Sequence, residues 1–253
     1  MFFWFKKNTT VVDAFTSSAI VHEQYPIVKA ARGVPEWWKR LPASTPKKGF
    51  EMIPEGTMKS CNGFMDLYST GFILPLWTDI AVELSHIENV KIWKYQFADN
   101  TSIIQIHDYE SFAGMVDPNL YQHFKIIAPW VLNSKKDTPF LMTQPVWNGG
   151  NSLGKYVNLP GVVEFKYQYS INVNTMWEYI PGQVRQVTLE AGMPLVHLIP
   201  LTEDRVEIRC HEITAEEFNK KHHPIVKFKG SHKERKLRLN SNEPSGCPFK
   251  LWH

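Results

Sequence analysis

Hydrophobic and polar positions alternate most regularly in the late middle of the chain, from Gly161 to Ile213. This region contains four runs rich in β-branched and aromatic residues: GVVEFKYQYSINV, VRQVTLEAG, MPLVHLIPL and DRVEIRCHEI. Turn residues separate the runs at Pro181-Gly182, Ala191-Gly192 and Thr202 to Asp204. A period of two residues is typical of β-strands with one buried face. We therefore expect a meander of β-strands that forms the core of a sandwich or a barrel.

Several earlier segments are predicted to be strands on the same grounds. Val90 to Phe97 and Thr101 to Ile106 flank a turn signal at Asp99-Asn100, so we expect them to pair as a hairpin. The other candidates are the second half of the segment from Cys61 to Leu84, then Phe124 to Leu132, and Pro139 to Trp147 before a turn at Asn148 to Asn151. The expected fold is mainly β: a sandwich or a distorted barrel, like a jelly roll or a double-stranded β-helix, with short N-terminal and late helices.

Two regions contain helix signals. Tyr25 to Pro42 holds two short helical pieces that a Gly-Val-Pro sequence separates, and Ala43 to Glu55 is expected to be a loop. Late in the chain, Thr214 is followed three residues later by Glu217. This spacing is that of a capping box, in which each residue satisfies a backbone N–H group of the other, and it predicts a short helix that ends near His222.

Composition limits the organisation of the chain. Its 253 residues are compatible with one domain, and we expect a single β-rich domain over residues 1–253, in which residues 1–55 form a partly helical N-terminal arm. Hydrophobic residues make up 43% of the chain, which is enough for a sizeable core, and aromatic residues make up 13%. The formal charge of +3 is too small to indicate a polyanionic partner for the whole molecule.

Targeting signals and cysteine patterns point to a soluble, cytoplasmic protein. No segment reaches the ~18 uninterrupted apolar residues that a membrane-spanning helix needs, so no membrane partner is expected. In the first residues, MFFWFKKN, the lysines follow the apolar residues, whereas a secretory signal has them first. The three cysteines include no C-x-x-C pair, so the sequence indicates neither a zinc ribbon nor a disulfide framework.

Ten histidines raise the question of a metal site. Cupin-like oxygenases hold Fe(II) with a His-x-Asp or His-x-Glu pair on one strand and a distant histidine. His86 and Glu88 have this spacing, and His197 lies on a later strand. Arg205 or Arg209 would then bind the carboxylate of a cosubstrate such as 2-oxoglutarate. In the competing interpretation, His86 lies at the surface in a turn-like segment and His197 packs in the core.

Other chemistries find less support. The chain has no G-x-S-x-G or S-x-x-K sequence and no glycine-rich phosphate loop, and Cys61 has no histidine nearby in the sequence. The basic segment from Lys227 to Arg238 could lie along a nucleic-acid backbone. We favour an exposed strand edge instead, where lysines discourage aggregation, so a nucleic-acid partner is not expected.

Longer phrases of the sequence resemble a known group of proteins. They are VPEWWKRLP, KSCNGFMD, TGFILPLWTDI, HFKIIAPWVLNSKKDTPFLMTQPVWN and AGMPLVHLIPL, which together span most of the chain from Val34 to Leu201. In these phrases the chain resembles an uncharacterised family of proteins from marine T4-like phages and some bacteria. The family has no established activity, so the resemblance implies a viral or bacterial source. It implies no catalytic residues, and its location would be the host cytoplasm or the virion.

The sequence therefore leads to two functional hypotheses. The first is a non-catalytic accessory protein that binds a protein partner, a small ligand or a second copy of itself through aromatic-rich surfaces. Its basis is the surplus of rings without a convincing set of acid, base or nucleophile. The alternative is a cupin-like, non-haem Fe(II) and 2-oxoglutarate-type oxygenase centred on His86, Glu88 and His197.

Overall fold

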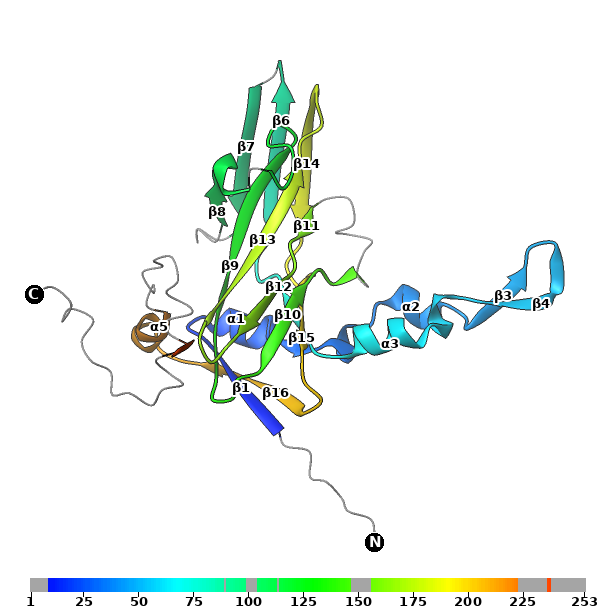
Figure 1. The fold of residues 1–253 in the computed structure, drawn as a ribbon. Coiled ribbons are helices and arrows are strands. Elements are labelled where there is room, and N and C mark those ends of the chain that lie inside the picture. The colour runs from blue at the N-terminus through cyan, green and yellow to red at the C-terminus, as the bar shows by residue number, and fades with distance from the viewer. Residues whose placement is uncertain are drawn as a thin grey trace, which may run out of the picture.

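The structure is a computed structural model that describes residues 9–88, 90–98, 104–112, 114–146, 156–222 and 236–237. Its fold is mainly β, with several sheets that do not close into a barrel (Figure 1). The helices within these ranges are short: α1 (Ala19–Gln24), α2 (Glu36–Arg40), α3 (Asn62–Ser69) and α5 (Ala215–His222). Single turns of 3₁₀-helix are η1 (Ala30–Gly33), η2 (Met58–Ser60) and η3 (Tyr109–Ser111).

Two sheets form the body of the sandwich. The six-stranded sheet has the order β11 (Val157–Asn158), β13 (Ser170–Glu178), β9 (Tyr121–Ser134), β1 (Thr9–Thr16), β16 (Arg205–Glu212), and β8 (Ile104–His107) also pairs with β9. The five-stranded sheet has the order β12 (Gly161–Glu164), β10 (Pro139–Thr143), β15 (Pro194–Pro200), β5 (Phe72–Pro75), β2 (Val28–Lys29). The strands pair antiparallel in both sheets, except that β1 and β16 run parallel.

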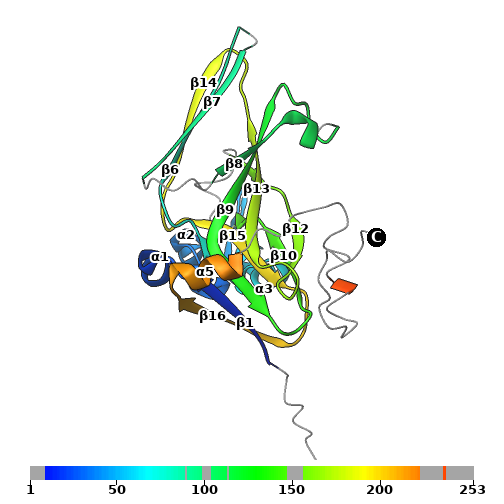
Figure 2. The same ribbon diagram turned by 90° about the vertical axis from the view of Figure 1, so that its left-hand side faces the viewer.

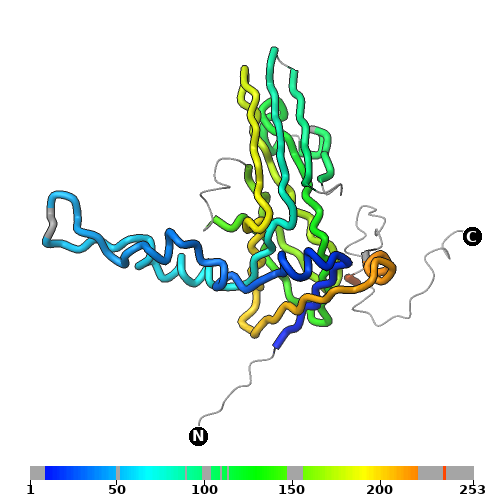
Figure 3. The backbone as a smooth tube through the Cα atoms, turned by 180° about the vertical axis from the view of Figure 1, so that it is seen from behind, coloured from blue at the N-terminus to red at the C-terminus, as the bar shows by residue number. Residues whose placement is uncertain are grey.

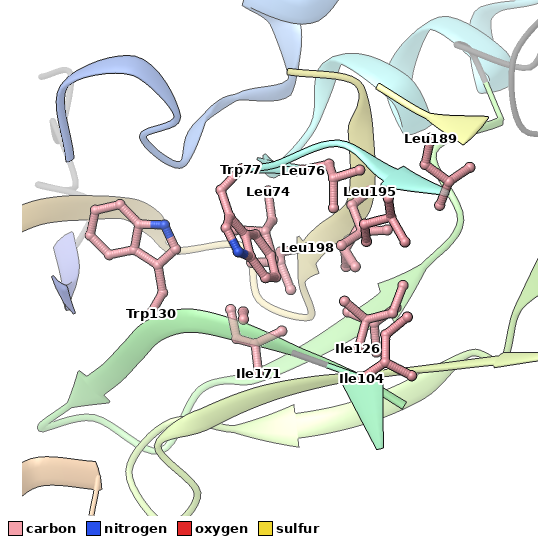
Figure 4. Packing of buried hydrophobic residues seen from close by; sticks show 14 of the residues in the cluster. Leu74, Leu76, Trp77, Ile104, Ile126, Trp130, Ile171, Leu189, Leu195 and Leu198 are labelled. Carbon is pink, nitrogen blue, oxygen red and sulfur yellow. The ribbon is translucent and has the colours of Figure 1, made fainter. Parts of the chain in front are cut away.

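The core lies between these two sheets because their inward faces are apolar. In β9 every second residue from Phe124 to Trp130 is buried, as the period of two requires. Figure 4 shows Ile126 of this strand near Leu195 and Leu198 of the five-stranded sheet, and Trp130 of the same strand on the side of Trp77, which follows β5. Each fully buried aliphatic side chain of this kind contributes about 2 kcal/mol, so the sandwich supplies most of the stability of the molecule.

A three-stranded sheet rises above one end of the sandwich (Figures 1 and 2). Its order is β14 (Gln183–Leu189), β6 (Ile80–Ile87), β7 (Val90–Phe97). Three rings at alternate positions of β7, those of Trp93, Tyr95 and Phe97, form one row on the face that also holds Val82 and Leu84 of β6. Trp93 contacts Phe124 of β9 edge to face at 6.1 Å, which joins this sheet to the sandwich.

Between β2 and β5 the chain leaves the sandwich and forms an arm, which we define as residues 30–70. The arm contains η1, α2, the hairpin of β3 (Ser44–Lys47) with β4 (Phe50–Gly56), η2 and α3. Figures 1 and 3 show this segment extending sideways from the two sheets, with the β3–β4 hairpin at its far end. The two hairpin strands pair only with each other among the described residues.

The mainly β class is confirmed, but two predicted pairings are wrong. The late strands form no meander, because β13 pairs with β9, β14 with β6, β15 with both β5 and β10, and β16 with β1. The strand from Val90 to Phe97 pairs with β6 across a tight turn at Glu88, whose φ is +50°, whereas Ile104 to His107 pairs with β9. Alternation of apolar residues identifies strands and their buried faces, but it does not identify partners that are distant in the chain. The turn at Asn148 to Asn151 lies outside the described residues.

The expected N-terminal arm also needs correction. Residues 9–16 form β1, an interior strand of the six-stranded sheet, with Val12 and Ala14 fully buried. The segment from Ala43 to Glu55 forms all but the last residue of the β3–β4 hairpin and is not an irregular loop. The late capping box is confirmed: the hydroxyl of Thr214 donates to the Glu217 carboxylate at 2.9 Å and accepts from the Glu217 N–H at 3.2 Å.

Candidate functional site

A row of aromatic rings connects the sandwich core to the surface of the arm. It begins at His197 of β15, whose imidazole stacks on Tyr68 of α3 at a centroid distance of 6.1 Å. Tyr68 is 4.5 Å from Phe64, Phe64 stacks on Trp38 at 5.2 Å, and Trp38 meets Trp37 edge to face at 5.4 Å. All four separations lie in the range of favourable ring contacts. We call these five residues the ring row.

Local sequence explains how two short helices present these rings. Phe64 and Tyr68 are four residues apart on α3, so they lie on the same helix face. Pro35 precedes α2 as its N-cap, and Leu41 N–H closes the helix on the carbonyls of both tryptophans. Because Trp37 and Trp38 are adjacent, they point in different directions: Trp38 is 2% exposed and Trp37 is 46% exposed. One tryptophan therefore anchors the arm, and the other covers its outside.

His197 is the inner end of the ring row, and its environment fits a structural role. The imidazole is buried, and its Nε2–H donates to the carbonyl oxygen of Thr70 at 2.7 Å. Burial lowers the pKa of His197, so the ring is neutral at pH 7. Burial also raises the pKa of the Tyr68 hydroxyl. The stacked rings of His197 and Tyr68 therefore join the arm to β15.

Gly71 makes the junction between the arm and the sheet possible. Its φ is +81°, a conformation that favours glycine. A Cβ atom at this position would lie 2.2 Å from the carbonyl oxygen of Leu198. The backbone of β15 and the end of α3 can therefore approach each other only because residue 71 has no side chain.

The outer surface of the arm carries large apolar side chains in contact with solvent. Met52 near the hairpin tip is 96% exposed, and four more large apolar side chains of the arm are exposed: Trp37, Ile53, Met58 and Leu67. The base of the hairpin is held by hydrogen bonds, in which Thr57 N–H donates to the carbonyl oxygen of Ala43 at 3.0 Å. The arm thus contains both a small cluster of packed rings and several exposed apolar side chains.

The three residues of the predicted iron site do not come together. His86 is at the end of β6 and Glu88 in the turn after it, both in the three-stranded sheet, whereas His197 belongs to the five-stranded sheet. The imidazole of His86 meets the ring of Tyr179 edge to face at 6.2 Å. Over the described ranges, no three His, Cys, Asp or Glu side chains form a group that could hold a metal ion. The arrangement gives the oxygenase hypothesis no geometric basis.

The two arginines proposed for a cosubstrate lie on β16, an edge strand of the six-stranded sheet. Arg209 donates through Nε to the Glu207 carboxylate at 3.1 Å, and this hydrogen bond raises the pKa of Arg209. Arg205 is exposed at the start of the same strand, in register with Thr9. Neither is on the sheet that contains His197. Of the basic segment, only residues 236–237 are described, and Lys236 pairs with Glu164 at 2.9 Å.

A cavity lined by strands of the six-stranded sheet and by β10 and β12 is a feature that we did not predict. It has a volume of about 320 Å³, and His107 and His123 line it with their rings stacked at 4.8 Å. The two histidines are directly opposite each other on β8 and β9. The alternation of His123 and Lys125 with buried Phe124 and Ile126 marks this face in the sequence. The partner strand could not be identified in the same way, because β8 was expected to pair elsewhere.

Comparison with known proteins adds no family assignment. No model of a protein family matches the chain, and no curated protein matches it significantly. The resemblance to proteins of marine phages therefore stays a prediction. Within the described ranges, every helix is too short or too polar to cross a lipid bilayer.

Proposed function

We propose that this protein is a non-catalytic binding or assembly protein that contacts a protein partner through its arm. The observation that carries this proposal is the set of exposed apolar side chains on the arm, from Trp37 to Leu67, on a segment that extends away from the sandwich. Several large apolar side chains exposed on one projecting segment favour an interaction site, because exposing them to water costs free energy that a partner can recover.

The construction of the arm supports the same function. The β3–β4 hairpin pairs with no other strand of the described ranges, and an isolated two-stranded hairpin is marginally stable in water, so contact with a partner would stabilise it. The ring row connects α2 and α3 to β15 through His197, so the base of the arm has a defined position before binding. A positioned surface loses less conformational entropy on association than a flexible one does. The arm therefore combines a packed base with exposed apolar side chains that a partner could cover.

Most aromatic rings contribute to this function indirectly, by packing inside the protein and not by contacting the partner. Most large rings of the described chain fill the cores, and Trp37 and Trp93 are the exposed aromatic residues among its large apolar side chains. The contact surface that we propose is thus formed by one tryptophan together with methionine, isoleucine and leucine side chains. Methionine suits such a surface because its unbranched side chain adapts to the shape of a partner.

Light scattering after size exclusion, combined with chemical cross-linking, tests the proposal. We expect the purified protein to self-associate, or to capture a protein from the cells in which it acts. Trp37→Lys with Met52→Lys should weaken that contact at least tenfold, because each buried lysine ammonium would lose its hydration. Ile20→Lys is the matched control, since Ile20 is 61% exposed on α1, outside the arm. A wild-type protein that stays monomeric and captures nothing, or an interaction that the double variant leaves intact, would contradict the proposal.

A further inference from the structure

The cavity on the six-stranded sheet has one polar wall and one apolar wall. The polar wall comes from β8, β9 and β13 and contains His107, His123, Lys125, Asn172 and Asn174. The apolar wall comes from β10 and β12 and contains Met142, Val162 and Val163. A volume of about 320 Å³ is at the lower end of the range for small-molecule sites.

The polar wall follows from strand register. Phe124 and Ile126 of β9 point into the core, so His123 and Lys125 between them point to the opposite face. Pairing with β13 places Asn174 directly opposite Lys125, and Asn172 follows two residues earlier on the same face. Three neighbouring strands therefore contribute polar side chains to one patch, and each side chain is carried by a regular sheet backbone.

Hydrogen bonding and charge define what the polar wall offers to a ligand. The Oδ1 atom of Asn174 accepts from His123 Nε2–H at 3.3 Å, so the NH₂ group of the same side chain remains a donor for the cavity. Burial, and then the neighbouring imidazole of His107, lower the pKa of His123. Burial and the charge of Lys125 lower the pKa of His107, against the opposing effect of Asp108. Both imidazoles are thus neutral at pH 7.

We propose that this cavity binds a small molecule that carries one oxyanion group, a carboxylate or a phosphate, attached to a short apolar portion. The ammonium group of Lys125 and the amide donors of Asn172 and Asn174 would bind the oxyanion. The side chains of Met142 and Val163 would cover the apolar portion. No described residue that lines the cavity is acidic, so nothing among them repels an anion.

Titrations followed by NMR test this site directly, with the imidazole signals of His107 and His123 as reporters. Benzoate and phenyl phosphate represent the two oxyanion classes, and benzamide has the shape of benzoate without its charge. We expect at least one of the anions to shift both imidazole signals in a saturable manner at constant ionic strength, and benzamide to leave them unchanged. Binding of benzoate alone would assign a carboxylate ligand, and binding of phenyl phosphate alone would assign a phosphate ligand.

Two variants test whether the anion binds at Lys125 and Asn174. Lys125→Gln should weaken binding about tenfold or more, because a charge-assisted hydrogen bond is lost. Asn174→Asp should weaken it to a similar degree by placing a negative charge opposite Lys125 in the site. Lys94→Gln is the matched control, since Lys94 is a strand lysine of the three-stranded sheet, where it pairs with Glu83 at 3.2 Å.

Three results would overturn the site: no saturable shift with either anion, equal binding of benzamide and benzoate, or unchanged binding in both variants of the cavity. The cavity shares no residue with the arm. Its test is therefore independent of the function that we propose for the arm.

Discussion

In the sandwich, apolar side chains of one sheet meet those of the other, whereas in the arm a few apolar side chains pack against each other and several more are exposed to water. The buried cluster of the sandwich draws residues from β1, β5, β9, β13 and β15. That of the arm consists of Trp38 and Tyr68, with Val34, Phe64 and Met65 packed against them. The difference shows how each region is stabilised. The sandwich is stabilised by its own large core, whereas the arm depends on its junction with β15 and on the surfaces that it contacts.

The largest expected effect comes from removing a ring of the sandwich core. Trp177 is fully buried, stacks on Tyr156 at 5.0 Å, and its Nε1–H donates to Thr175 Oγ1 at 2.7 Å. Trp177→Ala should lower the free energy of unfolding by about 3 to 5 kcal/mol, because it leaves a large cavity. Urea denaturation followed by far-UV circular dichroism measures this effect. A loss below about 1 kcal/mol would show that the sandwich core is not the main source of stability.

At the junction of the two regions, Gly71→Ala should have the next largest effect. The added Cβ would meet the Leu198 carbonyl at 2.2 Å, and the positive φ adds strain, so we expect a loss of about 3 kcal/mol. Gly182→Ala is the matched control, because Gly182 has a φ of +75° with nothing within 4 Å of the added atom, and should lose only about 1 kcal/mol. Equal losses in the two variants, measured by urea denaturation, would mean that close packing at the junction is unimportant.

Within the arm, Trp38→Ala should act locally. Trp38 belongs to the small cluster of the arm and not to the sandwich core. We expect the free energy of opening the arm to fall by about 3 kcal/mol, while amides of β9 and β13 keep their protection. Hydrogen exchange with peptide-level readout distinguishes the two regions. Faster exchange across both sheets would show that the arm and the sandwich unfold as one unit.

The sequence predicted the β class, most strand positions and the late capping box, because these depend on residues close together in the chain. The runs around Phe124, Val173 and Val196 alternate or are apolar as buried strands should be, and they form β9, β13 and β15. Strand partners were mispredicted because pairing depends on tertiary packing. β1 was missed because two of the four residues on its buried face, Thr10 and Thr16, are polar, so TTVVDAFT shows little alternation of apolar and polar residues.

For the candidate sites, the sequence drew attention to His86, Glu88 and His197, but it did not predict which residues they contact. His197 does occupy a late core strand, but it contacts Tyr68 and Thr70, which are more than 120 residues away in the chain. The spacing of His86 and Glu88 suggested an iron site, yet Glu88 lies in a turn and the pair is on another sheet. Short spacings specify which side chains share a strand face. They do not specify which sheets those faces meet, and a binding site depends on that.

The smallest expected effect is the pH dependence of stability, to which histidines of both the junction and the cavity contribute. The pKa values of His197, His107 and His123 are all lowered in the folded protein, mainly by burial. Below the unfolded value of about 6.5, the unfolded chain therefore binds more protons than the folded one, and stability should fall as the pH decreases from about 7 toward the folded pKa values. Urea midpoints between pH 8 and pH 5 measure this slope.

Two sets of substitutions show how much each region contributes to the change of stability with pH. His197→Asn should remove the part that belongs to the arm junction, and His107→Gln with His123→Gln should remove the part that belongs to the cavity, whatever each does to stability at pH 8. Because His197 is the most deeply buried of the three, its removal should flatten the slope the most. An unchanged slope in His197→Asn would mean that this imidazole can be protonated without opening the junction, and the ring row would then be less rigid than its contacts indicate.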